Sequence, residues 1–378
     1  MPAPPSNGPR RPRRRSTTEE EGSGAAAKPN RRTTLADVAR RAGVSQTTAS
    51  FVLSGRREEM RISAQIEAKV LEAVAETGYR PNVVSRSLRT GSSHTIGFVS
   101  DTVATTPFAG HLIWGALDAA RERDRLLLIA ETEGDAELET QMIETMRDRQ
   151  VEGIVLASMY TRRTNVPAAL LDGPGVLLNI VPTRACAVPV VIPDEAEAGR
   201  TAARHLLEAG YREGIYLVGV GVNPPKTPRG AVAASERLLG IIEELAAAGV
   251  TPAGGAYVKD WQPKGGYEAT KELLRRRHQP KALICFNDRL SMGAFQALED
   301  AALMVARDVS VISFDDEPVA SWLRPALTSI ALPHYELGRQ AIELLLAPGS
   351  EAPGGVHRVP MPLRLRESVG RVERTATG

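Results

Sequence analysis

An amide and two hydroxyl side chains stand next to one another near the N-terminus, in the run Gln46-Thr47-Thr48. Ser45 precedes them and is a favoured N-cap residue, so the spacing places all three in the first turn of a short helix. A Gln side chain can make two hydrogen bonds to adenine, and Thr presents a hydroxyl or a methyl group to a base edge. The pattern favours a helix that reads DNA from its first turn, although a helical hairpin without a role in DNA binding has the same spacing.

Three predicted helices position this turn. Thr34 and Asp37 have the spacing of a capping box ahead of the first helix, and Gly43 ends it. The second helix follows Ser45, and the third extends over about residues 63–77. Two short helices joined by a tight turn indicate a helix-turn-helix domain, in which the second helix enters the major groove.

The net charge of +2 conceals two unequal parts of the chain. Residues 1–92 carry 17 Lys/Arg and 9 Asp/Glu, whereas residues 93–378 carry 30 Lys/Arg and 36 Asp/Glu. Residues 33–92 alone keep the same sign, with 9 basic and 6 acidic groups. A basic N-terminal part joined to an acidic body is typical of a protein that binds a polyanion through one end.

The first 32 residues are rich in Pro, Gly, Ser and Arg and have no apolar periodicity. We therefore expect a disordered basic tail over residues 1–32, and a second, short tail over residues 369–378. The arginines of the first tail are available for non-specific phosphate contacts, and a solvated tail without a function fits equally well.

From residue 95 onward, short β-type runs alternate with amphipathic helical segments. The expected strands are 96–100, 126–130, 153–157, 175–179, 214–220, 282–286 and 309–314. The expected helices are 110–123, 137–149, 197–209, 233–248, 265–276, 290–301 and 335–346. This alternation implies an α/β body of parallel sheets with helices on both faces, and its length suits two sheets better than one. Such sheets bind ligands beyond the carboxyl ends of their strands.

Other classes of protein lack support in the sequence. There is no Gly-x-Gly-x-x-Gly after the first expected strand, no Walker motif and no nucleophile elbow, and the six His have neither triad nor metal spacing. We therefore expect no enzyme activity, no catalytic residue, no metal and no cofactor. The two Cys, the short apolar runs and the absence of a signal-peptide pattern indicate a cytoplasmic protein with no membrane partner.

Several separate motifs follow one another along the chain. After the helix-turn-helix segment come Gly78-Tyr79-Arg80-Pro81-Asn82 and Ser85-Arg86-Ser87-Leu88-Arg89-Thr90-Gly91. The body contains Thr95-Ile96-Gly97-Phe98-Val99, Phe286-Asn287-Asp288, Asp308-Val309-Ser310-Val311-Ile312-Ser313-Phe314-Asp315-Asp316, Pro325-Ala326-Leu327-Thr328-Ser329-Ile330 and Leu365-Arg366-Glu367-Ser368. In this order they resemble the lac repressor (LacI/GalR) family over nearly the whole chain after residue 32.

The resemblance implies a homodimer, or a tetramer, that binds double-stranded DNA at a near-palindromic operator. It also implies that residues 82–89 fold on DNA as a hinge helix, with Leu88 as an apolar wedge in the minor groove. The segment is short and basic, which suits a helix that forms only on DNA, although Leu88 also fits packing against a dimer partner. The residues expected to contact DNA are Thr34, Ser45, Gln46, Thr47, Thr48, Ser50, Phe51, Tyr79, Asn82, Ser85, Arg86 and Leu88.

The resemblance further implies a body like the type I periplasmic binding proteins, in which the chain crosses three times between two Rossmann-like lobes. We expect crossings near residues 192–193, 332–334 and 357–361, each of which contains Pro. The expected domains are a helix-turn-helix (33–80), a hinge and linker (81–93), and an effector-binding and dimerisation body (94–368). Its first lobe comprises about 94–192 plus 333–356, and its second lobe about 193–332 plus 357–368.

Candidate effector contacts follow from the family pattern position by position. They are Phe108, Asn179, Arg237, Trp261, Asn287 and Asp315. An Arg facing carboxylates and amides suits a hydroxyl-rich ligand, such as a sugar or a related metabolite. Simpler explanations exist for single residues, because an Asp at a strand end often caps the next helix and Trp261 fits packing within a lobe.

The chain departs from the family pattern at several positions. Phe51 and Ser85 differ from the common residues of the DNA-contacting part, and Ala231, Ala233 and Ile180 differ from those of the pocket. Leu332 and His334 line the second crossing, and Asn179 stands where Asp is usual. These departures leave the operator open, and they leave a sugar, a nucleobase and a protein open as the effector.

The sequence therefore predicts an allosteric transcription regulator, most simply a repressor, whose operator affinity responds to an effector bound between the lobes. The alternative is a cytoplasmic solute-binding protein without regulatory DNA binding. It shares the body, but the N-terminal domain and the absence of a signal-peptide pattern argue against it.

Overall fold

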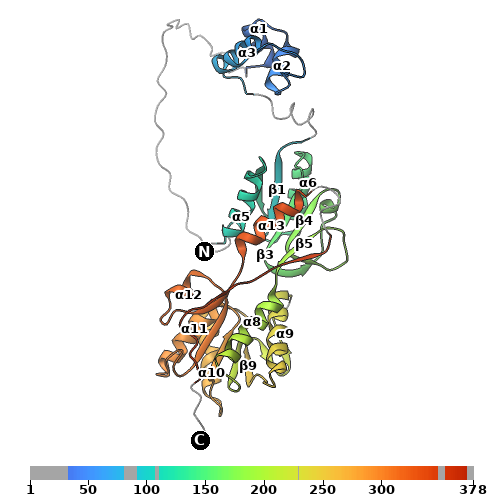
Figure 1. The fold of residues 1–378 in the computed structure, drawn as a ribbon. Helices are drawn as coiled ribbons and strands as arrows, with labels where there is room; N and C mark the ends of the chain where they lie inside the picture. Colours follow the sequence, from blue (N-terminus) through green and yellow to red (C-terminus); the bar gives the residue numbers. More distant parts are fainter. Residues whose placement is uncertain (1–32, 81–91, 107–109, 229, 348–353, 373–378) are drawn as a thin grey trace, which may run out of the picture. The chain divides into compact units, whose positions relative to one another are not determined.

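The computed structural model describes residues 33–80, 92–106, 110–228, 230–347 and 354–372 (Figure 1). The chain divides into two compact units, Met1–Arg86 and Ser87–Gly378. The first expected tail, the hinge at residues 82–89 and the candidate Phe108 lie outside the described residues.

The N-terminal unit contains α1 (Leu35–Ala42), α2 (Gln46–Leu53) and α3 (Ala64–Thr77). The first two helices begin at the predicted caps, and α3 begins within the predicted range. The Thr34 side chain accepts a hydrogen bond from the Asp37 N–H and the Asp37 carboxylate accepts one from the Thr34 N–H, which makes the expected capping box. Ser45 caps α2 through the Thr48 N–H, and Gly43 ends α1 with a left-handed φ of 68°.

A small apolar core holds these three helices together. Its buried residues are Val38, Ala39, Ala49, Val52, Val70 and Ala73. Because α2 contributes Ala49 and Val52 to this core, its opposite face and its first turn stay at the surface.

The first sheet of the body is entirely parallel, in the order β13-β5-β4-β3-β1-β2. Its strands are β1 (Thr95–Ser100), β2 (Leu126–Glu131), β3 (Ile154–Thr164), β4 (Gly175–Pro182), β5 (Val190–Pro193) and β13 (Val356–Val359). The helices of this lobe are α5 (Gly110–Arg121), α6 (Ala136–Asp148), α7 (Ala168–Leu171) and α13 (His334–Leu345). β3 continues seven residues beyond the predicted strand, through a register shift between Ala157 and Arg162.

The second sheet has the order β14-β12-β11-β10-β6-β9 and is parallel except for β14. Its strands are β6 (Ile215–Gly219), β9 (Gly254–Tyr257), β10 (Ala282–Cys285), β11 (Ser310–Asp315), β12 (Thr328–Ala331) and β14 (Leu363–Arg364). Its helices are α8 (Glu195–Glu208), α9 (Val232–Ala247), α10 (Pro263–Leu274), α11 (Asp288–Asp300) and α12 (Pro318–Trp322). A separate two-stranded ribbon joins β7 (Gly221–Val222) to β8 (Pro225–Lys226).

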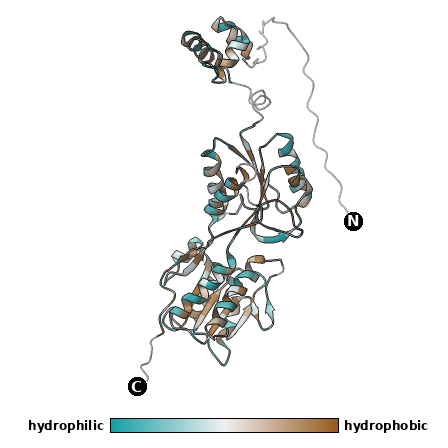
Figure 2. Ribbon diagram, turned by 45° about the vertical axis from the view of Figure 1, so that its right-hand side comes forward, coloured by the Kyte–Doolittle hydropathy of each residue, from teal (hydrophilic) through white to brown (hydrophobic). Residues whose placement is uncertain are grey.

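Alternate residues of the first sheet enter two apolar clusters. Phe98 and Val155 pack with residues of α5 and α13, whereas the next residues, Val99 and Leu156, pack with residues of α6. A two-residue period that fills both faces is what a parallel sheet between two helical layers requires. Figure 2 accordingly shows hydrophobic colour gathered on the strands and on the sides of the helices that face them.

The chain passes between the lobes after β5, after β12 and after β13. The third passage corrects one expected boundary. The sequence predicts residues 357–359 in the second lobe, but they belong to β13 and pair with residues 191–193 of β5 in the first sheet. Residues 369–372, expected as part of a tail, lie on the second lobe, since Gly370 N donates to Ser310 Oγ (2.8 Å) and Val372 N to Ala209 O (2.9 Å).

In the described part of the body, three pairs of helices touch where a glycine of each helix lies against the backbone of the other. The pairs are Gly115 and Gly338 between α5 and α13, Gly199 and Gly240 between α8 and α9, and Gly266 and Gly293 between α10 and α11. A Cβ atom at any of the six would lie between 1.9 and 2.2 Å from a carbonyl oxygen of the partner helix. These helices therefore pack backbone against backbone, closer than any side chain allows.

Candidate functional site

The first turn of α2 presents the two side chains predicted to read bases. Gln46 and Thr47 are exposed, and within the described part of the chain no hydrogen bond engages either side chain. Thr48 is half-buried, and its hydroxyl lies 2.8 Å from the Ser45 hydroxyl that caps the helix. Gln46 and Thr47 are thus the members of the predicted set most available to a partner.

The side chains of the remaining described members of the DNA-contacting set make contacts within the N-terminal unit or are half-buried in it. Phe51 is half-buried, with the Arg56 guanidinium 5.5 Å from its ring centroid. Tyr79 packs against the small core, and Ser50 is half-buried. Thr34 is exposed, and its hydroxyl donates to Asp37. The other four, Asn82, Ser85, Arg86 and Leu88, lie outside the described residues.

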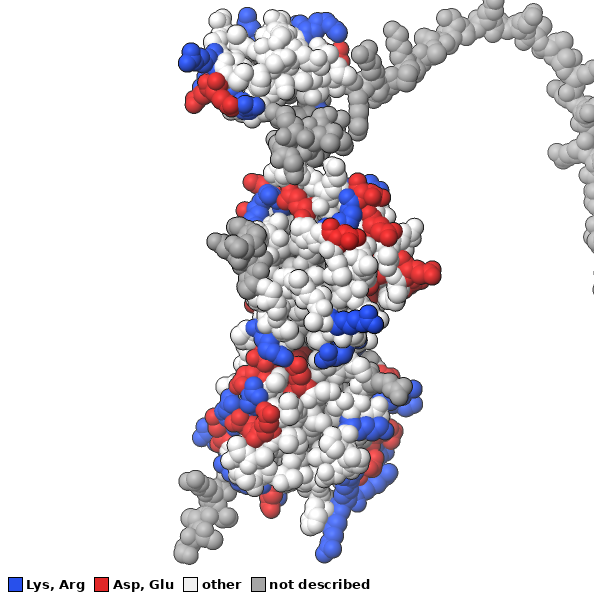
Figure 3. All heavy atoms as spheres, turned by 90° about the vertical axis from the view of Figure 1, so that its right-hand side faces the viewer, with Lys and Arg blue, Asp and Glu red and all other residues white. Residues whose placement is uncertain are grey.

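Two arginines precede the first turn of α2 in the sequence. Arg40 and Arg41 occupy the last turn of α1, with exposed side chains. Figure 3 shows both basic and acidic side chains on the viewed face of this unit. Arg40 is paired with Asp37 (3.2 Å) and Arg41 with Glu76 (2.6 Å). Exposed Arg side chains suit contact with phosphates, which fixes the position of a protein on DNA without reading sequence.

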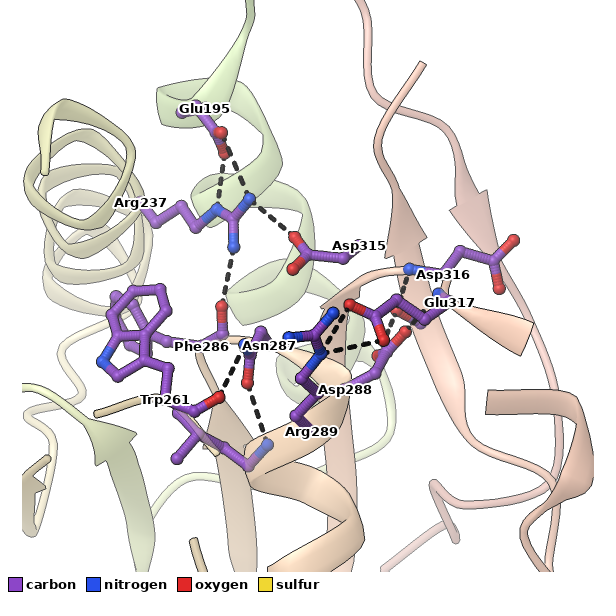
Figure 4. Close-up of polar contacts among 12 residues, drawn as sticks. Glu195, Arg237, Trp261, Phe286, Asn287, Asp288, Arg289, Asp315, Asp316 and Glu317 are labelled. Atoms are coloured by element: carbon purple, nitrogen blue, oxygen red, sulfur yellow. Dashed lines mark hydrogen bonds and ion pairs between the residues drawn. The ribbon is translucent and has the colours of Figure 1, made fainter. Parts of the chain in front are cut away.

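In the body, Arg237 of α9 is the centre of a buried charged network (Figure 4). Its Nε and Nη2 donate to the two carboxylate oxygens of Glu195 at 2.5 and 3.1 Å. Nη2 also donates to Asp315 Oδ1 (2.9 Å), and Nη1 donates to the carbonyl oxygen of Phe286 (2.7 Å). Burial lowers the pKa of Arg237, but the charges of Glu195 and Asp315 raise it by more, so the guanidinium stays charged.

The neighbouring candidates Asn287 and Trp261 are tied to each other. Asn287 Oδ1 caps α11 by accepting from the Leu290 N–H (2.8 Å), and Nδ2 donates to the Trp261 carbonyl oxygen (3.2 Å). The Trp261 indole N–H donates to the Gly219 carbonyl oxygen (3.2 Å), and its ring meets Phe286 edge-on. Both residues therefore have structural tasks that fix their positions at the carboxyl ends of the second sheet's strands.

Two candidates have strained backbones, one at the end of a strand and one within a strand. Asp315 ends β11 with a φ of 98°, and Asn179 in β4 has a φ of 57°. Non-glycine residues in this region cost about 1–3 kcal/mol each, and they gather at functional sites. The sequence identified both residues from the family pattern, and the strain adds an independent reason to place function there.

Asn179 belongs to a polar group at the strand ends of the first sheet. Its Nδ2 donates to the Ser158 carbonyl oxygen (3.0 Å), while its buried Oδ1 has no hydrogen-bond partner among the described residues. Asp101 accepts from the Ser158 hydroxyl (2.7 Å) and the Met159 N–H (2.9 Å). A backbone bridge joins Arg162 to Ala231, so this end of the first sheet adjoins the start of α9 in the second lobe.

A cavity of about 1010 Å³ lies among the crossing segments. It is lined by residues 332–335 and 359–362 of two crossings, by residues 315–318, and by His111 and Met159 from the first lobe, among others. Of the described effector candidates only Asp315 lines this cavity. The other described candidates lie outside its lining. Asp315 joins the charged network to the cavity, because its Oδ1 contacts Arg237 while the residue borders the cavity.

Sequence reasoning missed Glu195, the only carboxylate that holds Arg237 from two sides in the described structure. No motif marks it, because its partner is 42 residues away on another helix. It also missed Asp288, which is fully buried and accepts from the Ser329 hydroxyl (2.8 Å) and the Glu317 N–H (2.7 Å). Asp288 directly follows the strand-end residue Asn287, and this position could have identified it from the sequence.

Models of known families match both units. Residues 34–82 match the bacterial regulatory proteins of the lacI family. Residues 93–366 match the periplasmic binding proteins and sugar binding domain of the LacI family. This second match alone covers more than half of the chain.

The chain belongs to the LacI family. It is a DNA-binding transcription regulator with a helix-turn-helix domain and an effector-binding body, as the sequence predicted. The ribose operon repressor of Escherichia coli (strain K12) is 32% identical over 316 residues, which are 83% of this chain and 92% of the relative.

Solved structures of the LacI family share the fold. A lac repressor dimer bound to operator and the anti-inducer ONPF superimposes with a TM-score of 0.73 at 24% identity, covering 89% of this chain and 99% of that one. The transcriptional regulator CelR in complex with cellobiose has a TM-score of 0.61 at 27% identity, covering 89% and 100%. The predicted fold class, a small helical domain plus a two-lobed α/β body, is confirmed.

Within the described residues, no helix combines the length and the apolar sequence that a membrane span needs. No group of three or more His, Cys, Asp or Glu side chains there is arranged to hold a metal ion.

Proposed function

We propose that the protein is a repressor whose homodimer binds a near-palindromic operator, and that a sugar or related metabolite held between the lobes controls operator affinity. One observation carries the proposal: a single chain joins an exposed reading turn, Gln46-Thr47, to a buried charged network that reaches a cavity at Asp315. An effector that shifts one lobe against the other changes how two paired helix-turn-helix domains are held.

Features of the relatives support the same proposal. One is a ribose operon repressor, one was solved with cellobiose, and one was solved as a dimer on operator. Large apolar side chains on the body suit a second copy, since Trp114 on α5 is 56% exposed and Trp322 on α12 is 70% exposed. Sedimentation of the full chain, with and without DNA, distinguishes monomer, dimer and tetramer.

The first test is the salt dependence of DNA binding. The affinity of the full chain for a DNA library is expected to fall steeply with salt, because Lys and Arg displace counterions from phosphates. Fluorescence anisotropy from about 50 to 200 mM salt gives the slope. A slope near zero contradicts the proposal and favours a solute-binding protein without regulatory DNA binding.

The substitution Gln46→Ala is expected to relax operator choice. The side chain is exposed on the first turn of α2, and each bidentate base contact contributes about 1–3 kcal/mol of discrimination. Selection of bound sequences from a randomised library, followed by anisotropy, measures the loss. Gln65→Ala on the exposed face of α3 is the matched control and should leave the preference unchanged. Equal effects of both substitutions would remove Gln46 from the reading surface.

The hinge forms the remaining part of the proposal. We expect Leu88→Ala to weaken binding to the selected operator while sparing non-specific DNA, because an apolar wedge is useful only where a base step opens. Equal loss on both DNAs would refute the wedge. A regulator of this kind acts where the genome lies, so we place the protein in the cytoplasm.

A further inference from the structure

We infer that the effector is an uncharged or cationic molecule rich in hydroxyl or ammonium donors, and that Glu195 determines this specificity by keeping anions away from Arg237. The inference rests on the proposed function of the body and narrows its ligand. It assigns to Glu195 a role that is absent from the predicted site.

An unpaired arginine in a cleft is a strong binder of phosphates and carboxylates, because its planar guanidinium offers five N–H donors. Arg237 is not in that state. Four of its N–H groups are engaged, two by Glu195, one by Asp315 and one by the Phe286 carbonyl oxygen. A ligand anion would have to displace a carboxylate that is already seated in the geometry the guanidinium prefers.

The charge balance points the same way. Glu195 and Arg237 are 2% and 3% exposed, and the Asp315 side chain is 18% exposed. Two carboxylates against one guanidinium give the cluster formed by Glu195, Arg237 and Asp315 a net charge of −1. Water screens such buried charges poorly, so a ligand phosphate at this cluster meets repulsion.

The arginines that line the cavity, Arg289, Arg364 and Arg366, are each paired with Glu317 or Asp316. Two acceptor atoms of the effector candidates have no such partner. Asp315 has one carboxylate oxygen in contact with Arg237, and its other oxygen has no hydrogen bond within the described residues, where the residue borders the cavity. In the first lobe Asn179, which does not line this cavity, has a buried Oδ1 without a partner among the described residues. A buried acceptor without a donor is costly, and the hydroxyl or ammonium groups of a ligand satisfy it, whereas an ionised phosphate or carboxylate brings no hydrogen.

The experiment measures the full chain against matched sugars by calorimetry and thermal shift. The probes are ribose with ribose 5-phosphate, and glucose with glucosamine and glucose 6-phosphate, at constant ionic strength. For a sugar that binds, the phosphate ester is expected to bind at least about tenfold more weakly than its parent. Glu195→Gln should reduce the ratio of the two dissociation constants, phosphate ester over parent sugar, by about tenfold, since it removes one of the two carboxylate charges.

The matched control is Glu197→Gln. It makes the same charge change on the same helix, at a side chain that is 46% exposed and paired with Arg200 and Arg204. For this control, the ratio of the dissociation constants of phosphate ester and parent sugar should equal that of the unchanged protein. Asp315→Asn provides a second route to the same loss of charge if Glu195→Gln does not fold.

A second arm separates this inference from the proposed function. Inorganic phosphate, compared with chloride at equal ionic strength, should raise the melting temperature of the Glu195→Gln or Asp315→Asn protein and not that of the unchanged protein. If phosphate selectivity changes in this way while no sugar binds, sugar control fails and the role of Glu195 stands. A phosphate ester that binds the unchanged protein as tightly as its parent sugar, or variants with unaltered phosphate response, would overturn the role of Glu195.

Discussion

Replacing Arg237 by Ala should lower the free energy of unfolding of the body by about 3–5 kcal/mol, because two carboxylates then lose their shared cation. Glu195 is 2% exposed and cannot turn to water without opening the contact between α8 and α9. Urea denaturation followed by circular dichroism measures the change, provided that the slope with denaturant is unaltered.

A double substitution distinguishes the cost of the unpaired carboxylates from the cost of lost packing. In the double substitution Glu195→Gln with Arg237→Gln, two amides replace the ion pair, so most of the stability should return. If Arg237→Ala alone costs less than about 1 kcal/mol, the network is not the stabilising element that its burial indicates. If the double substitution costs as much as the single one, lost packing and not the unpaired charge is responsible.

The substitution Gly338→Ala is expected to cost about 3 kcal/mol or more, although it adds only one methyl group. A Cβ at this position would lie 1.9 Å from the Leu112 carbonyl oxygen and 3.0 Å from the Ala116 N–H nitrogen. Both are backbone atoms, so relief requires α5 and α13 to separate. The midpoint of thermal unfolding should fall by several degrees in a body of this size.

A second glycine on the same pair of helices serves as the control. Gly110 begins α5, and a Cβ there would meet no atom within 4 Å. Gly110→Ala should therefore be neutral or slightly stabilising. A similar loss for the two substitutions would mean that glycine content, and not contact between backbones, sets the stability of this helix pair.

Local chemistry made the N-terminal unit predictable. Thr34, Ser45 and Ser63 each cap a helix through a bond to a residue three positions later, and such pairs are visible in the sequence. Apolar runs located central strands of the body such as β1 and β10.

Several short strands escaped prediction, among them β5 and β12 inside the sheets and β9 and β13 at their edges. For the two edge strands there is a physical reason. β13 has the sequence Val-His-Arg-Val, and β9 has the sequence Gly-Gly-Ala-Tyr. Neither has an apolar run, because an edge strand is covered on fewer sides than a central one. Their pairing partners decide their conformation, and β13 pairs with β5 from more than 160 residues earlier. That distance also explains the misplaced boundary at residues 357–359.

The candidate effector site was predictable in its strand-end members and not in its helix-borne carboxylate. Asn287 and Asp315 stand where parallel strands end, a place that topology marks for ligands. Glu195 acts only because α8 and α9 lie together and bring it to Arg237, which no period within either helix encodes.

The glycine contact between α8 and α9 gives Gly199 an influence on recognition that its chemistry hides. A Cβ on Gly199 would lie 2.2 Å from the carbonyl oxygen of Arg237 itself, one turn of α8 beyond Glu195. The distance across which the carboxylate holds the guanidinium is therefore set by two backbones in contact. A residue without a side chain to offer a ligand thus sets the spacing between the two charged groups of the network.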